Sequence, residues 1–281
     1  MFNLSRFSAF LLTITLLFVG AYALVSNADH SWGNYHWART GNTFTLKLGD
    51  NVSSAWDAYL GGASSDWSAS SVLDTAIVAG GTNNAKGKYT PKNCVPTSGR
   101  VEVCSAKYGR TGWLGLAQIW ASGDHIVQGT AKVNDTYFNT TTYNTPAWRR
   151  LVICQEIAHD FGLDHQDEIF NNANLGTCMD YTNDPDGGPG GAVNNDPSNE
   201  HPNTHDYEWL ETIYAHFDSI TTVGQSIFGS GNRASLGNGV NGQEVAEWGK
   251  AIRTSSDGKP SLFERDLGNG NKVFTFVIWA E

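Results

Sequence analysis

Residues 155–165 read Gln-Glu-Ile-Ala-His-Asp-Phe-Gly-Leu-Asp-His, and this run decides the fold and the function that the sequence predicts. Successive residues of an α-helix turn by about 100°, so positions four apart share a face. Gln155 and His159 are therefore expected on one side of a helix, with Glu156 next to them. Gly162 suits the left-handed conformation that ends a helix, because glycine has no Cβ to clash.

His165 follows the turn at Gly162, so its side chain can meet the face that carries Gln155 and His159. The spacing is that of an extended zinc-protease motif, H-E-x-x-H-x-x-G-x-x-H, in which the first position is a zinc-binding histidine. Here that position is Gln155. Three protein ligands leave one coordination place for water, which is the catalytic rather than the structural arrangement. Glu156 lies where a general base could take a proton from that water.

The residues around the motif support a buried helix. Thr145 and Pro146 form an N-cap followed by proline at the first helical position. Most of segment 147–161 is apolar, which is enough to bury the helix on nearly all sides: Trp148, Leu151, Val152, Ile153, Ile157, Ala158 and Phe161. A polar strip inside such a helix needs a reason to exist. The alternative, a solvated acidic helix end with two unrelated histidines, leaves the strip unexplained.

The run resembles the metzincin clan of zinc metallopeptidases, in its matrixin-, astacin- and serralysin-like members. A second element carries the same resemblance, because Thr177-Cys178-Met179-Asp180-Tyr181 looks like the Met-turn that places a methionine beneath the metal. The Met-x-Tyr spacing is similar to that of astacin- and serralysin-like members, which implies that Tyr181 approaches the metal or the transition state. The alternative is that Met179 and Tyr181 are ordinary packed core residues.

The resemblance implies a fold of the α/β (α+β) class. The expected catalytic domain has a twisted, mixed, five-stranded sheet, the active-site helix, the Met-turn and a closing C-terminal helix at 205–217. By the same resemblance, segment 114–120 is the edge strand, where a peptide substrate could pair as an added strand. An ordinary edge strand with no binding role is the alternative.

The chain divides into four parts on composition and pattern. Residues 1–28 read as a signal peptide, with a short apolar core followed by small residues. Residues 29–217 form the catalytic domain, and the Gly-, Ser- and Asn-rich stretch 218–245 reads as a linker. Residues 246–281 form a small C-terminal extension with a β-hairpin, either appended or packed on the catalytic domain as a flap. The protein is expected to be secreted, monomeric and without stable membrane association.

Charge and cysteine content narrow the partners. The formal net charge is −10 and no dense basic run occurs, so nucleic-acid binding is disfavoured and a peptide or protein substrate is expected. The 4 cysteines fit an oxidising compartment and allow three pairings. The favoured pairs are Cys94–Cys104, which closes a local loop, and Cys154–Cys178, which ties the active-site helix to the residue before Met179.

Two further questions concern metal ions. The segment 182–204 is rich in Asn, Asp, Gly and Pro and is expected to be a loop, in which carboxylates could hold calcium. It does not match an EF-hand. His201, His205 and His216 are expected at the surface or at helix ends rather than as ligands, and His201 is the first to examine if the zinc site lacks a ligand.

Gln155 can be explained in three ways, and the first two predict different functions. In the first, its amide oxygen is a weak zinc ligand beside His159 and His165, and the protein is a secreted endopeptidase that uses a metal-activated water with Glu156 as general base. Tyr181 then helps to stabilise the oxyanion. In the second, the site has lost its metal and the chain is an inactive extracellular binding protein. Another residue completing the shell is the third way to account for Gln155.

Overall fold

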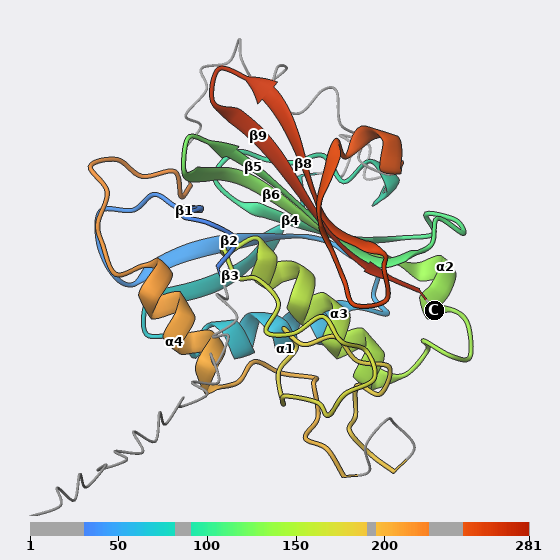
Figure 1. Ribbon diagram of the computed structural model, residues 1–281. Coiled ribbons are helices and arrows are strands. Elements are labelled where there is room, and N and C mark those ends of the chain that lie inside the picture. Colours follow the sequence, from blue (N-terminus) through green and yellow to red (C-terminus); the bar gives the residue numbers. More distant parts are fainter. Residues whose placement is uncertain (1–30, 82–90, 190–194, 225–243, 281) are drawn as a thin grey trace, which may run out of the picture.

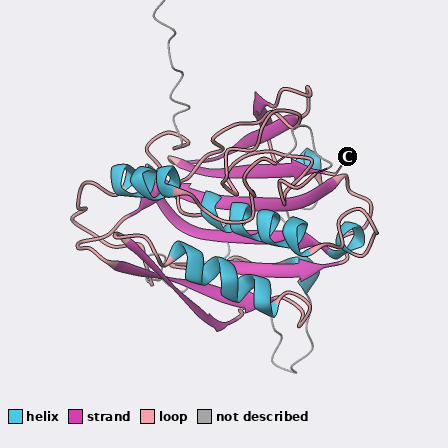
Figure 2. Cartoon of the chain, turned by 90° about the horizontal axis from the view of Figure 1, so that it is seen from below, coloured by secondary structure: helices cyan, strands magenta, loops and turns pink. Residues whose placement is uncertain are grey.

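The computed structural model describes residues 31–81, 91–189, 195–224 and 244–280. One sheet carries the longer helices on a single face, with its strands running behind them (Figures 1 and 2). The signal peptide predicted for residues 1–28 and most of the linker predicted for 218–245 lie outside the described residues. Within the described part, no helix is long and apolar enough to cross a membrane.

Strands and helices alternate along much of the chain, and a run of strands ends it. In chain order the elements are β1 (His36–Trp37), β2 (Phe44–Asn51), α1 (Asp57–Trp67), β3 (Leu73–Ala79), η1 (Pro91–Asn93), β4 (Val101–Ala106), β5 (Trp113–Ser122), β6 (His125–Asn134), α2 (Asp135–Phe138), α3 (Pro146–His159), α4 (Thr204–Ile213), η2 (Val245–Glu247), β7 (Lys250–Thr254), β8 (Pro260–Gly268) and β9 (Asn271–Trp279).

The sheet has two halves of different character. Its strand order is β3-β2-β4-β6-β5-β9-β8-β7, and β1 pairs with β6 outside this path. Strands β1, β2, β3, β4 and β6 pair in parallel, whereas β5, β7, β8 and β9 pair antiparallel. The mixed α/β class predicted from the sequence therefore describes the chain.

Two details of the predicted sheet are wrong. Over the described residues the sheet has nine strands rather than five, and β5 is an interior strand rather than the edge. The cause is the C-terminal hairpin, which lies in the same sheet as the strands before it (Figure 1). Strand β9 runs antiparallel along β5, with Ile119 opposite Phe274 and Ala117 opposite Phe276. Hydrophobic alternation predicts a strand but not the partner that it pairs with.

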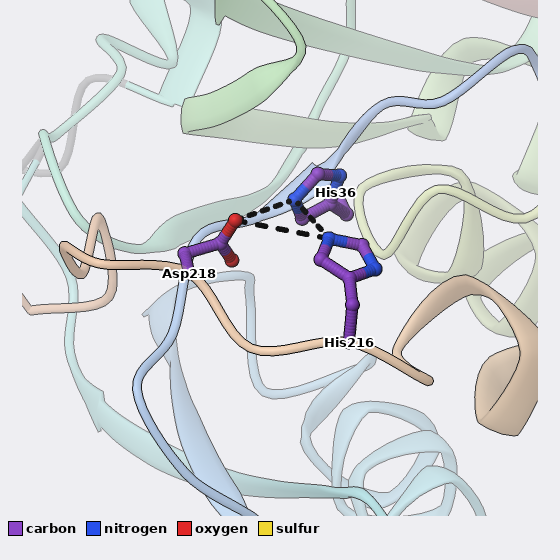
Figure 3. A group of neighbouring side chains, drawn as sticks. All are labelled: His36, His216 and Asp218. Carbon is purple, nitrogen blue, oxygen red and sulfur yellow. Dashed lines mark hydrogen bonds and ion pairs between the residues drawn. The ribbon is translucent and has the colours of Figure 1, made fainter.

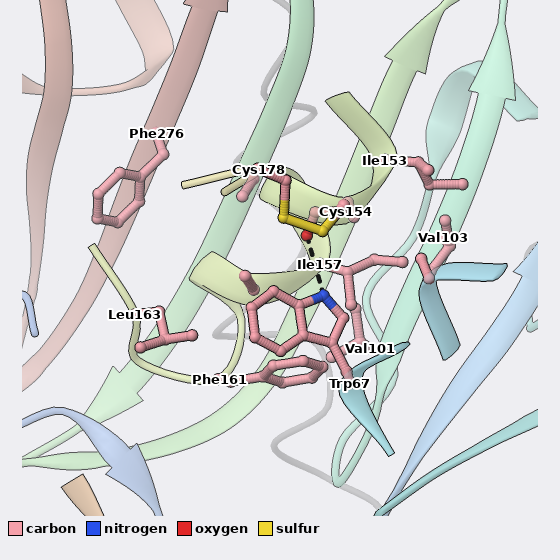
Figure 4. Close-up of a cluster of buried hydrophobic side chains, with 14 of the residues drawn as sticks. Trp67, Val101, Val103, Ile153, Cys154, Ile157, Phe161, Leu163, Cys178 and Phe276 are labelled. Carbon is pink, nitrogen blue, oxygen red and sulfur yellow. Dashed lines mark hydrogen bonds between the residues drawn. A yellow bond between two sulfur atoms is a disulfide. The ribbon is translucent and has the colours of Figure 1, made fainter. Parts of the chain in front are cut away.

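The core lies between the sheet and helices α1 and α3, and it ties the predicted active-site helix in place. Trp67, fully buried at the end of α1, donates its indole N–H to the Cys154 carbonyl at 3.2 Å (Figure 4). Both favoured cysteine pairs are present as disulfides, Cys94–Cys104 and Cys154–Cys178. The second joins α3 to the turn before Met179, as predicted.

The opposite face of the sheet buries a polar row across three strands. Lys132 Nζ donates to Gln118 Oε1 at 2.7 Å, and Gln118 Nε2 donates to Thr275 Oγ1 at 3.3 Å. All three residues are at most 2% exposed. Burial lowers the pKa of Lys132 to about 7, and the Glu247 carboxylate opposes this shift only in part. A buried amine is therefore largely uncharged in the folded protein above neutral pH.

Lys132 is expected to make stability depend on pH. The unfolded chain protonates this lysine below about 10.5, whereas the folded chain does so only below about 7. Between these values the unfolded state binds more protons, so the free energy of unfolding rises with pH, by up to about 1.4 kcal/mol per pH unit. Urea unfolding of the Lys132→Met protein from pH 7 to 10 should lack this slope. Lys47→Met, at an exposed position on β2, should keep it.

Candidate active site

Helix α3 begins and ends where its sequence predicts. The Thr145 hydroxyl accepts the Trp148 amide at 3.2 Å, and Pro146 occupies the first helical position. At the other end Gly162 adopts a φ of +99°, and a Cβ there would lie 2.6 Å from the Tyr35 carbonyl oxygen. Glycine is thus required both by the left-handed conformation and by close approach of the N-terminal segment.

Three side chains from distant segments bond the last carbonyls of α3, which have no partner within a helix. Trp32 Nε1 donates to His159 O at 3.2 Å, and Trp37 Nε1 donates to Asp160 O at 2.7 Å. The Tyr214 hydroxyl, next to the end of α4, donates to Phe161 O at 2.8 Å. The helix end that carries the motif is therefore fixed from both sides.

His159 and His165 come together as the motif predicts. Their ring centroids lie 4.5 Å apart and the rings are nearly perpendicular. His159 Nδ1 lies 2.9 Å from Leu163 O, and His165 Nδ1 lies 2.7 Å from Glu168 Oε1. In both rings Nδ1 thus carries the hydrogen, so the lone pair of the neutral imidazole is on Nε2. A carboxylate or carbonyl behind the imidazole is the usual support of a metal-binding histidine.

The support behind His165 is an ionic cluster that the motif alone does not predict. Glu168 bonds His165 and also accepts the Ser261 hydroxyl at 2.8 Å. Arg253, from β7, pairs with Asp164 through both terminal nitrogens and approaches Glu168. Burial acts to raise the pKa of Glu168, but bonds from His165, Ser261 and Arg253 outweigh it and bring the pKa to about 2. Glu168 is therefore a stable carboxylate partner for His165.

The Gln155 side chain is fully buried, and only one end of its amide group is hydrogen-bonded within the described chain. Its amide nitrogen donates to Cys178 O at 2.9 Å, while its Oε1 has no hydrogen-bonding partner among the described residues. The bond to Cys178 fixes the amide, because nitrogen and not oxygen must face that carbonyl. The turn at Cys178 and Met179 therefore lies against the helix and orients the one oxygen that Gln155 can offer. Met179 is fully buried within the same core.

Glu156 is held against β5 at a glycine. A Cβ on Gly115 would lie 2.4 Å from Glu156 Oε1, so only glycine leaves room for this carboxyl group. Burial raises the pKa of Glu156 well above its usual value, and the Asp160 carboxyl adds to the rise. Neither oxygen makes a well-formed hydrogen bond with the described residues, although the Ala117 amide opposes the rise in pKa. Burial thus favours the protonated form of Glu156 in this closed structure.

Asp160, four residues after Glu156, is a second buried acid that lies against a glycine of a strand. It is fully buried, and burial raises its pKa well above the usual value. A Cβ on Gly129 of β6 would lie 2.0 Å from Asp160 Oδ1. Sequence reasoning missed Asp160, yet a signal was present. Isolated glycines within strands indicate close approach by another group, and here they face the two acids of α3.

Strand β9 covers the site. The Phe276 ring stacks on His159 with centroids 4.0 Å apart and an interplanar angle of 11°. The Tyr181 hydroxyl donates to Val277 O at 2.9 Å, and its ring lies 4.4 Å from the His165 ring. The motif side chains are consequently almost without solvent contact, with exposures of 0% for Gln155, 1% for Glu156, 1% for His159 and 5% for His165.

The other histidines and the loop considered for metal binding lie elsewhere. His201 is exposed and bonds Asp66 at 2.7 Å, so it does not complete the shell around Gln155. The part of the 182–204 loop that the structure describes contains neither of the two His/Asp/Glu groups with metal-binding spacing found in the described chain. Calcium in this loop remains a prediction. His216, expected at the surface, belongs to one of those two groups.

Comparison with known proteins leaves the family undecided. No protein-family model matches the chain, and no curated protein matches it. Two weak matches among solved structures each cover 64% of this chain. One is the GM1-bound form of the ECX AB5 holotoxin, with a TM-score of 0.36, 14% identity and 86% of that chain covered. The other is high choriolytic enzyme 1, a hatching enzyme zinc-protease from Oryzias latipes (medaka), with a TM-score of 0.33, 12% identity and 94% covered. At these TM-scores neither match carries an argument about this chain.

Proposed function

We propose that this chain is a secreted, zinc-dependent endopeptidase that its own C-terminal hairpin holds closed. The observation that carries the proposal is the approach of the His159 and His165 rings to 4.5 Å, with both histidines held by hydrogen bonds at Nδ1. Gln155 lies buried one helical turn before His159 on α3. Structural histidines in a core have no need of this matched arrangement. The carboxylate behind His165 is the support typical of a metal ligand.

The donor set fits a zinc ion. Two imidazole nitrogens and one amide oxygen would hold it, and the buried Gln155 Oε1 has no other partner in the described chain. A buried, unsatisfied oxygen costs free energy, which coordination would relieve. A neutral oxygen is a weaker zinc ligand than imidazole, so this site should bind zinc less tightly than one with three histidines. A bound zinc ion would supply Lewis acidity toward a peptide carbonyl and toward water.

The remaining residues have defined parts in hydrolysis. Glu156 acts as the general base, taking a proton from the attacking water and returning it to the leaving amine. This requires the carboxylate form, which burial now disfavours. Entry of water into the cleft would lower the pKa of Glu156 toward its usual value. Tyr181 already donates to a peptide carbonyl, that of Val277, and can do the same for a developing oxyanion.

The position of β9 indicates how a peptide substrate would bind. An extended peptide can add to the exposed edge of a sheet through main-chain hydrogen bonds. Strand β9 pairs with β5 antiparallel over its full length and presents a side chain to His159 and a carbonyl to Tyr181. The hairpin therefore takes the place that a substrate would take. The enzyme would therefore be latent, because a substrate and the hairpin would compete for the same edge of β5.

The closure also favours a second candidate function. If the hairpin never leaves, Glu156 stays buried, where its carboxylate form is disfavoured, and the chain is an inactive binding protein of the same fold. The two candidates differ in zinc content and in chelator-sensitive proteolysis. Metal analysis of the wild type beside Gln155→Leu, both purified without chelator, separates them first, since a protein that has lost the α3 site should show no difference between the two.

Two substitutions at Gln155 test its part in zinc binding in opposite directions. Gln155→His restores an imidazole ligand and should raise zinc affinity by at least about 10-fold. Gln155→Leu removes the oxygen at similar volume and should lower the affinity by a similar factor. Competition against a chromophoric zinc chelator measures both. Equal affinities in the wild type and both variants would show that residue 155 is not a ligand and would remove the main support for the proposal.

A further inference from the structure

The geometry points to a second zinc site, formed by His36, His216 and Asp218 and independent of helix α3. The three side chains converge on one point from two segments far apart in the sequence (Figure 3). Their ligand atoms all lie within 4.8 Å of one another. His36 comes from β1, while His216 and Asp218 are in the segment that follows α4.

The distances match a tetrahedral ion. His36 Nε2 lies 3.4 Å from Asp218 Oδ1 and 3.1 Å from His216 Nε2, and His216 Nε2 lies 3.7 Å from Asp218 Oδ1. Ligand atoms at about 2.0–2.1 Å from zinc, on tetrahedral corners, lie about 3.3 Å apart. The three edges thus have the size that a shared zinc ion requires, and imidazole with carboxylate is a donor set that suits zinc.

The hydrogen positions favour an ion at this point. His36 Nδ1 lies 2.7 Å from Asn34 O, so it carries the hydrogen and the neutral ring has its lone pair on Nε2. That lone pair faces the second imidazole nitrogen, from His216, and the Asp218 carboxylate. Three electron-rich atoms directed at one point are stabilised by a cation between them.

The surroundings hold these ligands in place. Arg39 N donates to Asp218 Oδ2 at 3.0 Å, and Asp218 N donates to Arg39 O at 2.8 Å. His125, paired with His36 across β1 and β6, lies 3.2 Å from Asp218 Oδ1 through its Nε2. Its role is to orient the carboxylate, as outer-shell partners of zinc ligands do. His125 is therefore a positioning residue.

The site is open on one side. The His216 side chain is 53% exposed, and His36 and His216 border a cavity of about 410 Å³. Zinc can therefore enter from solvent, and a water molecule or small anion can complete the coordination. A zinc ion here would join β1 to the segment after α4. Those segments carry Trp37 and Tyr214, which bond the end of helix α3.

Zinc stoichiometry of the full-length chain tests this inference separately from the proposed function. Protein stripped with chelator and titrated with zinc at neutral pH should bind two equivalents, one of which is weakened in His216→Ala and the other in Gln155→Leu. His216→Ala should weaken this second site by at least about 100-fold, and His125→Ala by about 10–100-fold. His201→Ala is the matched control, because His201 is similarly exposed (57%) and likewise bonds an aspartate.

Each outcome of the titration decides between the two sites. Weaker binding of one equivalent in His216→Ala, with both affinities unchanged in Gln155→Leu, would uphold the second site and reject Gln155 as a ligand of the first. Unchanged stoichiometry and affinity in His216→Ala would overturn the inference and leave a hydrogen-bonded histidine pair only. Cobalt provides an independent readout, since each tetrahedral site gives an intense visible absorption, and His216→Ala should remove the part that comes from this second site.

Discussion

Replacing Phe276 by alanine is expected to open the active site and to raise zinc-dependent cleavage of casein by about 10²–10³-fold. Removing a buried phenylalanine ring costs about 3–5 kcal/mol, and this ring packs on His159 and the main core. Because each 1.4 kcal/mol changes a population about tenfold, a hairpin that is rarely displaced becomes displaced far more often. Hydrogen exchange of the β9 amides measures the opening, and casein cleavage with and without chelator measures its consequence.

Thr275→Ala is the matched control for this substitution. Thr275 is the adjacent residue of β9, equally buried, but it faces Gln118 on the other side of the sheet. Loss of one neutral hydrogen bond costs only about 1 kcal/mol, so exchange and cleavage should change by less than about tenfold. Faster exchange of β9 in Phe276→Ala without any cleavage would reject the peptidase and leave the inactive binding protein. Unchanged exchange would show that Phe276 does not hold the hairpin closed.

In the opened Phe276→Ala protein, Glu156→Gln is expected to lower casein cleavage by about 10²–10⁴-fold, the usual contribution of a general base. Glutamine has the size of glutamate, so it fits beside Gly115 without leaving a cavity. Zinc content should be unchanged, because Glu156 is not among the proposed ligands. Initial rates at saturating zinc, with metal analysis of the same samples, separate loss of the base from loss of the metal.

Asp160→Asn in the same background is the control for Glu156→Gln. Asp160 is another fully buried acid of the same helix end, housed by a strand glycine in the same way. It has no part in the proposed reaction, so its neutral analogue should leave cleavage close to that of Phe276→Ala. If the two amide variants lose activity equally, the effect is one of helix packing and Glu156 is not the base.

Local features of the site could be predicted from the sequence because they depend on local physics. The Thr145 cap, the left-handed Gly162 and the convergence of His159 and His165 follow from helix geometry and from the conformational freedom of glycine. The disulfide between Cys154 and Cys178 is one of three possible pairings, and the structure confirms it. Apart from the disulfide, whose cysteines are 24 residues apart, these features join residues within one or two helical turns of the sequence.

The features that were missed depend on contacts between distant segments. Phe276 is far from His159 along the chain, and no periodicity shows which strand β9 pairs with. Arg253, from a strand far along the chain, approaches the Glu168 carboxylate that bonds His165. The sequence predicts only a surface position for His216, because a single histidine has no sequence signal for a partner at His36.

Gly115 has a consequence for the history of such chains. The Glu156 carboxyl occupies the space where any side chain at position 115 would begin. A substitution that adds a side chain at 115 must displace the Glu156 carboxyl group. If residue 156 is first replaced by a shorter one, position 115 no longer needs to be glycine. Loss of the acid is thus followed by drift at a position on a different element of the fold. This chain has glycine at 115 and glutamate at 156 together, although Gln155 stands where the motif has a histidine.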